Sequence, residues 1–150
     1  LGKRTIWVDC DVLQADGGTR TASITGGCVA VAIALNRLMG KGLLKHFPLR
    51  KLVAAVSAGI YQNEAILDLN YPEDRDASVD FNVVMTENGE FVELQGSGEE
   101  DVFTNEQMTA MLDLSRDGIT KLVELQREAI IAADKPSSGD LDGLAASFQH

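Results

Sequence analysis

The sequence has 150 residues, of which 45% are hydrophobic and 24% charged, a composition typical of one globular domain rather than of a disordered chain. Its formal net charge at pH 7 is −10, which argues against a protein that coats nucleic acid through a basic surface of its own. No apolar run of about 18 residues is present, so we expect no transmembrane helix, and the first residues lack the pattern of a signal peptide.

The two cysteines, Cys10 and Cys28, stand among apolar neighbours, and neither has another cysteine or a histidine at metal-ligand spacing. We therefore expect two buried, reduced thiols. This expectation favours a cytoplasmic location and argues against a disulfide.

The first half of the chain is expected to begin with a strand at residues 5–15, which are rich in β-forming side chains. Asp16-Gly17-Gly18 follows and favours a turn. From Thr21 to Met39 apolar residues recur at helical spacing, and Gly40 and Gly42 stand where such a helix would end.

Two further strands are expected at residues 52–61 and 64–69, joined by a short turn at Gln62-Asn63. Residues 70–78 are polar and contain Pro72, so we expect a loop there that could include one helical turn.

Residues 79–85 alternate in polarity, with Phe81 on one face and Asp80 and Asn82 on the other, which predicts a half-buried strand. Asn88-Gly89 predicts a type I′ hairpin turn, and residues 91–95 the returning strand.

A last helix is expected to begin after Thr104, which forms a capping box with Gln107, and to run to about residue 131. Its buried stripe is expected to contain Met108, Met111, Leu112, Ile119, Leu122 and Val123. The order of elements predicts an α+β fold of two layers, a mixed β-sheet with helices on one side, over residues 1–132. Residues 133–150 are expected to be a flexible acidic tail.

The segment Gly17-Gly18-Thr19-Arg20 combines four features of an anion site. Two glycines allow close approach to the backbone, the start of a helix presents free N–H groups, Thr19 adds a hydroxyl, and Arg20 adds a permanently charged fork. The spacing is not that of a nucleotide P-loop. An ordinary strand-to-helix turn with a surface arginine explains the segment equally well.

Five carboxylates follow within a short stretch: Asp68, Glu73, Asp74, Asp76 and Asp80. Asp74 and Asp80 could converge on one Mg²⁺ or Mn²⁺, or one of them could be a general acid. A solvated acidic loop is the simpler interpretation, although a charge inside a strand, as at Asp80, usually has a purpose or an edge position.

Four segments resemble the ribonuclease PH family closely. They are Val8–Gly26, Val53–Ile60, Asp80–Thr86 and Val92–Gly96, and the resemblance covers about residues 1–132. It implies the fold of ribonuclease PH and of ribosomal protein S5 domain 2. It also implies the C-terminal half of a cytoplasmic exoribonuclease that acts in tRNA and rRNA processing without a membrane partner.

The implied activity is phosphate-dependent 3′-to-5′ trimming of tRNA precursors, with inorganic phosphate as co-substrate and nucleoside 5′-diphosphates as products. Members of the family assemble as rings, so a hexamer is implied for the intact enzyme. By position in the motif, Gly18, Thr19 and Arg20 correspond to residues that hold the attacking phosphate. Asp74 and Asp80 correspond to two acidic positions that serve acid catalysis and bind a divalent metal, Mg²⁺ or Mn²⁺. We expect Asp74 to be the general acid and Asp80 to hold the metal.

The chain departs from the family pattern in two informative ways. Family members have a preceding half that supplies a second phosphate-binding arginine and much of the basic RNA surface, and its absence would account for the charge of −10. The family's usual Gly-Thr-Ala-Glu-Gly is replaced by Gly96-Ser97-Gly98-Glu99-Glu100, a more acidic loop. A truncated half-domain without activity, serving in structure or assembly, is therefore an open alternative. A subunit like polynucleotide phosphorylase or the exosome core is another, although residues 9–26 favour ribonuclease PH.

Overall fold

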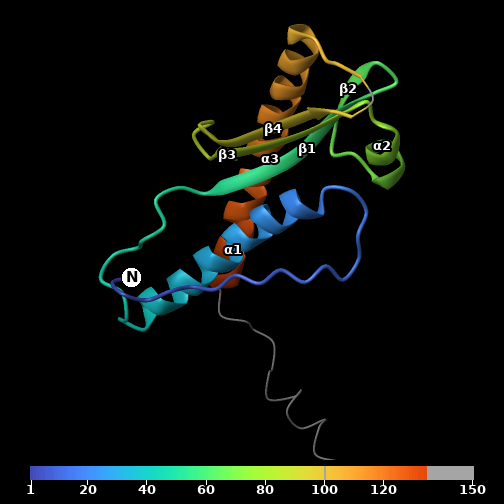
Figure 1. The fold of residues 1–150 in the computed structure, drawn as a ribbon. Coiled ribbons are helices and arrows are strands. Elements are labelled where there is room, and N and C mark those ends of the chain that lie inside the picture. The colour runs from blue at the N-terminus through green and yellow to red at the C-terminus, as the bar shows by residue number, and fades with distance from the viewer. Residues whose placement is uncertain (100, 135–150) are drawn as a thin grey trace, which may run out of the picture.

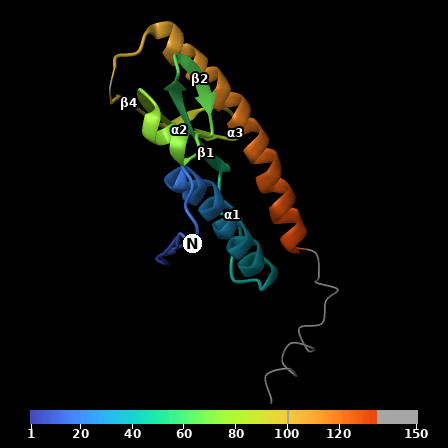
Figure 2. The ribbon, with the colours of Figure 1, turned by 90° about the vertical axis from the view of Figure 1, so that its right-hand side faces the viewer.

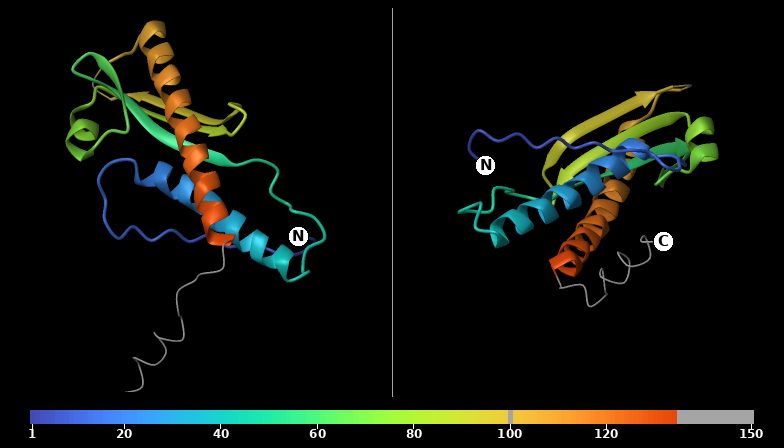
Figure 3. Two further views of the ribbon diagram at one scale, coloured as in Figure 1. Left: turned by 180° about the vertical axis from the view of Figure 1, so that it is seen from behind. Right: turned by 90° about the horizontal axis from the view of Figure 1, so that it is seen from below.

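The computed structural model describes residues 1–99 and 101–134, and it has the predicted α+β architecture (Figure 1). The elements are α1 (Thr19–Gly40), β1 (Val53–Tyr61), β2 (Glu64–Leu67), α2 (Tyr71–Asp76), β3 (Val79–Thr86), β4 (Phe91–Gly98) and α3 (Asn105–Asp134). The strands form one sheet in the order β2-β1-β3-β4, and α3 crosses one face of it (Figure 3).

The core lies between α3 and that face of the sheet. Alternate residues of β1 and β3 point into it, as period-two patterning requires. Phe81 is 2% exposed, and its ring contacts the ring of Phe103 edge to face, with centroids 6.4 Å apart. The predicted stripe of α3 is confirmed, because three members are buried and three pack partly buried against the core. The buried members are Met111, Ile119 and Val123, and the others are Met108, Leu112 and Leu122.

Helix α1 covers the part of the β1 edge that β2 leaves open (Figure 2). Strand β2 pairs only with residues 58–61 of β1. Further along, Thr25 Oγ1 accepts a hydrogen bond from Ala55 N (3.0 Å) and donates one to Ala55 O (3.3 Å). Gln126 of α3 donates to both Thr25 O and Val53 O at 2.9 Å. Side chains therefore satisfy backbone groups that a fifth strand would otherwise pair.

By length and composition, α1 meets the criteria for a membrane-crossing helix, with a mean hydropathy of 1.5 over its most apolar window. Core helices of folded domains meet the same criteria. We assign α1 to the domain, because its Thr25 side chain and its backbone are hydrogen-bonded to β1 and α3.

Residues 5–15 do not form the expected strand. They have no strand partner among the described residues, and Trp7 and Leu13 are 90% and 96% exposed. A β-forming composition reports a local tendency, whereas a strand needs a neighbouring strand for its hydrogen bonds. The sheet is accordingly antiparallel in all three pairings of the described strands, not mixed. Cys10, in the same segment, is exposed rather than buried, and Cys28 is half-buried.

The type I′ turn expected at Asn88-Gly89 is wrong. Only Gly89 has a positive φ (77°), and the bonds Gly89 N to Thr86 O and Thr86 N to Glu90 O, both 2.9 Å, close a three-residue loop with a glycine in the left-handed region. The two consecutive left-handed residues of a type I′ turn occur instead at Gln62 and Asn63, with φ of 50° and 68°.

Other boundaries moved by a few residues. Strand β2 ends at Leu67 rather than at residue 69, β4 continues to Gly98, and α3 continues to Asp134. The capping box of Thr104 and Gln107 is confirmed by reciprocal bonds of 2.9 and 3.2 Å. The tail expected at 133–150 falls, from residue 135 on, outside the described residues.

Candidate active site on the polar face of the sheet

The face of the sheet opposite α3 is polar across β3 and β4. The register aligns Ala55, Val84 and Glu93 in one row, Ser57, Asn82 and Gln95 in the next, and Gly59, Asp80 and Ser97 in a third. We call this surface the polar face. Because its rows alternate with the core rows, the same strands build the core on one side and a candidate site on the other.

The Gly17–Arg20 segment forms the left-handed turn into α1. Gly17 has a φ of 43°, and a Cβ there would stand 2.0 Å from Leu69 O, so only glycine fits without movement. Gly18, with a φ of 63°, is the N-cap and provides no side-chain cap for α1. No side chain caps the first N–H groups of this 22-residue helix, which is the arrangement that an anion site at this turn would need.

Ser57 lies beside this turn. Its Oγ is 3.2 Å from the position of a Gly18 Cβ, and the residue is 5% exposed. The hydroxyl has no hydrogen-bond partner within the described part of the chain. Buried hydroxyls are normally paired, so this one marks a polar opening next to the start of α1.

Arg20 extends over the polar face to β4. Its Nη2 lies 2.9 Å from both carboxylate oxygens of Glu93. The hydrogen bond and the charge of Glu93 raise the pKa of the Arg20 guanidinium above its already high ordinary value, so Arg20 is a permanent cation. The sequence did not indicate Glu93 as a partner, although the alternation of Glu93, Gln95 and Ser97 with Leu94 and Gly96 shows that these side chains share a face.

The structure separates the five acidic side chains by what they contact. Glu73 completes a capping box with Asn70 at the start of α2. Asp76 binds the neighbouring Arg75, which lowers the pKa of Asp76. Asp68 is exposed, with a φ of 59°. Within the described part of the chain, the side chains of Asp74 and Asp80 form no bond to a cation or to a helix cap.

Asp74 and Asp80 are close enough to interact. Burial raises the pKa of Asp80, and the negative charges of Asp74 and of Glu99 raise it further, while bonds from Phe81 N and the Asn82 side chain act against that rise. Asn82 Nδ2 lies 3.1 and 3.3 Å from the two Asp80 oxygens. Repulsion among three carboxylates is relieved by protonation of one of them or by a cation.

The two segments singled out in the sequence are linked by one hydrogen bond. Tyr71 N, in the first turn of α2, donates to Asp16 Oδ1 at 2.8 Å. Asp16 immediately precedes the Gly17–Arg20 turn, and α2 carries Asp74. The turn that presents Arg20 and the helix that presents Asp74 are thus tied to each other 55 residues apart in sequence.

The acidic pair has the oxygen ligands that Mg²⁺ and Mn²⁺ prefer. No group of three potential ligands close enough to hold a metal was found among the described residues. Mg²⁺ is often bound by one or two carboxylates together with water and substrate phosphate, so Asp74 and Asp80 fit a site that a substrate completes.

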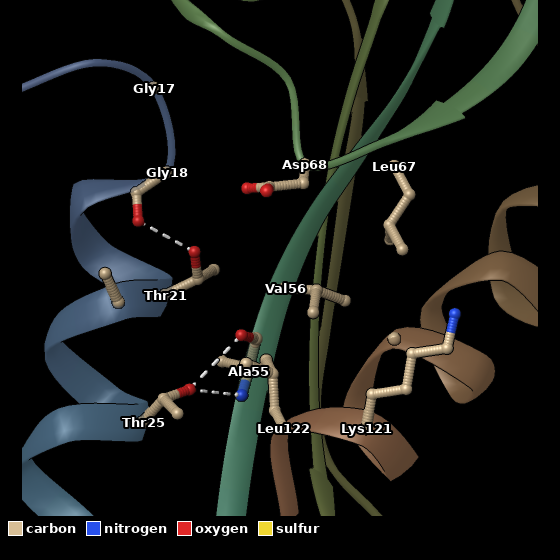
Figure 4. A pocket seen from close by; sticks show the side chains of 12 residues that line it. Gly17, Gly18, Thr21, Thr25, Ala55, Val56, Leu67, Asp68, Lys121 and Leu122 are labelled. Atoms are coloured by element: carbon tan, nitrogen blue, oxygen red, sulfur yellow. Dashed lines mark hydrogen bonds between the residues drawn. The ribbon is translucent and has the colours of Figure 1, made fainter. Parts of the chain in front are cut away.

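A cavity of about 470 Å³ adjoins the turn on its other side (Figure 4). Gly18 and Thr21 border it from α1, Asp68 from the end of β2, and Lys121 from α3. Thr21 Oγ1 donates to Gly18 O at 2.8 Å, which stabilises the first turn of α1 at the cavity wall. The Gly17-Gly18 backbone therefore borders an open cavity on this side.

The chain is similar to known proteins both in sequence and in fold. Residues 51–118 match the model of domain 2 of the 3′ exoribonuclease family. The chain is 58% identical over 133 residues to a ribonuclease PH of Crocosphaera subtropica, an alignment that covers 89% of this chain and 55% of that protein. The crystal structure of rice (Oryza sativa) Rrp46 superposes with a TM-score of 0.58 at 20% identity, covering 77% of this chain and 49% of that one.

The class of protein that the chain resembles follows first: residues 51–118 are similar to domain 2 of the 3′ exoribonuclease family. The particular resemblance follows from the longer match, which fits the C-terminal half of ribonuclease PH, as the motifs indicated. The likeness to Rrp46 concerns the fold alone. The chain spans about half the length of the curated relative that it matches.

Proposed function

We propose that this chain supplies half of the active site of a phosphate-dependent 3′-to-5′ exoribonuclease that trims tRNA precursors and acts in rRNA processing. One observation carries the proposal. An anion site with a permanent cation, at Gly18 to Arg20, and an acidic pair, at Asp74 and Asp80, are tied together beside one polar sheet face.

The chemistry divides among these residues. The N–H groups at the start of α1, the Thr19 hydroxyl and the Arg20 guanidinium hold inorganic phosphate. A phosphate oxygen attacks the last phosphodiester phosphorus, the P–O3′ bond breaks, and a nucleoside 5′-diphosphate leaves. The departing O3′ takes a proton from Asp74, and the RNA ends one nucleotide shorter. Asp80 would hold Mg²⁺ or Mn²⁺, which supplies positive charge at the phosphoryl groups.

The remaining features of the proposal concern the intact enzyme. A preceding half would add a basic RNA-binding surface. This chain, with its net charge of −10, does not provide one. Assembly as a hexameric ring in the cytoplasm, with no membrane partner, belongs to the same proposal. The apolar side chains exposed on residues 5–15, Trp7 and Leu13 above all, are suited to burial against another chain segment.

The test uses a tRNA with a 3′ extension, inorganic phosphate and Mg²⁺. The chain is assayed alone and together with the N-terminal half of a ribonuclease PH. We expect phosphate-dependent release of nucleoside diphosphates from the combined halves, abolished by removal of the metal. Mononucleotide release that is independent of phosphate would contradict the proposal.

Arg20→Ala is the sharpest variant in that assay. We expect a loss of about 10²-fold or more in phosphate-dependent activity, because a positioned donor for a charged group is removed, with the melting curve nearly unchanged. Arg116→Ala is the matched control, since Arg116 forms a local ion pair with Asp113 on α3. Unaltered phosphate dependence in Arg20→Ala would remove Arg20 from the site.

Activity in neither form of the assay would favour the second candidate, a half-domain with a role in structure or assembly only. The observation behind that candidate is the coverage of 55% of the relative's length. A polynucleotide phosphorylase-like or exosome-like subunit is the third candidate, and it would show phosphorolysis of unstructured RNA in preference to tRNA ends.

A further inference from the structure

Among the ion pairs of the described residues, Arg20–Glu93 spans the longest stretch of sequence. Arg75–Asp76 and Arg116–Asp113 join near neighbours on one helix, and Lys51–Glu90 and Arg127–Glu87 join residues 39 and 40 positions apart. The Arg20–Glu93 pair joins residues 73 positions apart and connects α1 to the edge strand β4. Helix α1 packs against β1, and β3 lies between β1 and β4 in the sheet. The ion pair also lies on the polar face, in the row that begins with Ala55.

The geometry leaves most of the guanidinium available. An arginine side chain has five N–H donors, and Glu93 receives only those of Nη2, at 2.9 Å. Within the described residues, Nε and Nη1 of Arg20 have no other hydrogen-bond partner. Because the Glu93 carboxylate holds only Nη2, it orients the guanidinium and leaves the N–H groups of Nε and Nη1 available to another acceptor.

Without this contact, Arg20 would have no reason to lie over the sheet. The Arg20 side chain starts in the first turn of α1 and is 52% exposed, even with the Glu93 contact in place. A free arginine samples many rotamers, and an anion that binds it has to immobilise it. An exposed ion pair adds little to folding stability, so the value of this pair lies in orientation.

We infer that Glu93 is a positioning residue, which holds the Arg20 guanidinium over the polar face so that Nε and Nη1 meet inorganic phosphate at the start of α1. This inference rests on the proposed function, because it assumes that phosphate binds there. It predicts that loss of Glu93 weakens phosphate binding, although removing a negative charge near an anion site would by itself strengthen it.

The experiment follows inorganic phosphate binding to the ¹⁵N-labelled 150-residue chain by NMR at constant ionic strength. The reporters are the Gly18 amide and the Arg20 Nε–H. In Glu93→Ala we expect the Kd for phosphate to rise roughly five- to tenfold, the effect of leaving one long side chain unrestrained. The Arg20 Nε–H resonance should also shift before phosphate is added. Glu93→Gln keeps one acceptor oxygen and should restore part of the affinity.

Glu90→Ala is the matched control, because Glu90 is also on the β3–β4 hairpin and pairs with Lys51 away from Arg20. It should leave the Kd unchanged. A Kd in Glu93→Ala that is equal to or lower than that of the unaltered chain overturns the positioning role, while the phosphate site stands. If the unaltered chain shows no saturable shift at Gly18 or Arg20, the phosphate site fails, and the role of Glu93 fails with it.

Discussion

Phe81 and Asn82 are neighbours on β3, yet they belong to the two opposite faces of the sheet. Phe81 contacts Phe103 and the core under α3, whereas Asn82 bonds Asp80 on the polar face. One face buries apolar area and holds the fold together. The other keeps charged and polar side chains close together, which costs stability in the case of Asp80.

This difference is the ordinary relation between a scaffold and a site. A rigid, packed layer allows a neighbouring layer to hold like charges at short range. Removing side chains from the core face should therefore lower stability strongly. Removing charge from the polar face should lower activity and leave stability equal or higher.

The largest expected change in stability is from Phe81→Ala. Removal of a fully buried ring leaves a cavity beside Gly96 and Phe103, so we expect the free energy of unfolding to fall by about 3–5 kcal/mol. Asn82→Ala, one residue along, is the matched control and should cost about 1 kcal/mol or less. Chemical denaturation of both variants measures their free energies of unfolding. Equal losses in the two variants would contradict the distinction between the core face and the polar face.

A smaller loss is expected from Gly17→Ala. The new Cβ would meet Leu69 O at 2.0 Å with φ at 43°, so the turn has to shift or unfold locally. We expect a cost of about 1–3 kcal/mol together with weaker phosphate binding, since Gly18 and Arg20 move with the turn. Gly26→Ala, in the open part of α1 where no atom stands within 4 Å, should be neutral or stabilising. Equal melting temperatures for the two variants would show that the turn is not strained by a side chain.

The smallest change in stability is expected from Asp80→Asn, and it should be an increase rather than a loss. The folded pKa of Asp80 is raised above the ordinary value of 3.8, so the native state binds the proton more tightly than the unfolded chain. The stabilising effect of that proton is complete below the unfolded pKa and is lost as pH rises through the folded pKa. At pH 7 the neutral asparagine removes the unfavourable burial and repulsion of the Asp80 charge, so the Tm should rise by roughly 1–2 °C, a modest gain because Asp80 is half-exposed.

Thermal melts of Asp80→Asn at pH 7 and near pH 4 test the sign. The advantage of the variant should shrink at the lower pH, because the raised pKa of Asp80 lets the native state take up the proton more readily than the unfolded chain. Activity and metal dependence should fall at both values. A lower Tm than that of the unaltered chain at pH 7 would show that Asp80 is a structural residue.

Much of the fold follows from local patterns. The stripe of α3, the alternation of β3 and the cap at Thr104 all appear in the structure, because each depends on residues a few positions apart. The failures have one cause in common. Residues 5–15 need a partner strand, and the turn at residues 87–89 depends on the register of β3 with β4. Composition reports neither.

The candidate site shows the same division. The sequence by itself indicated the glycine turn into a helix at Gly17–Arg20 as a candidate anion site, because its glycines, hydroxyl and arginine are consecutive and a helix follows them. It also determined that Asp80 and Asn82 share a face, because side chains alternate along a strand. Only the tertiary structure decided that Arg20 contacts Glu93, that Asp16 accepts a hydrogen bond from the first turn of α2, and that Asp80 is near Glu99. The first two contacts depend on the packing of α1 against β1, and the third depends on the pairing of β3 with β4, so no local preference determines any of them.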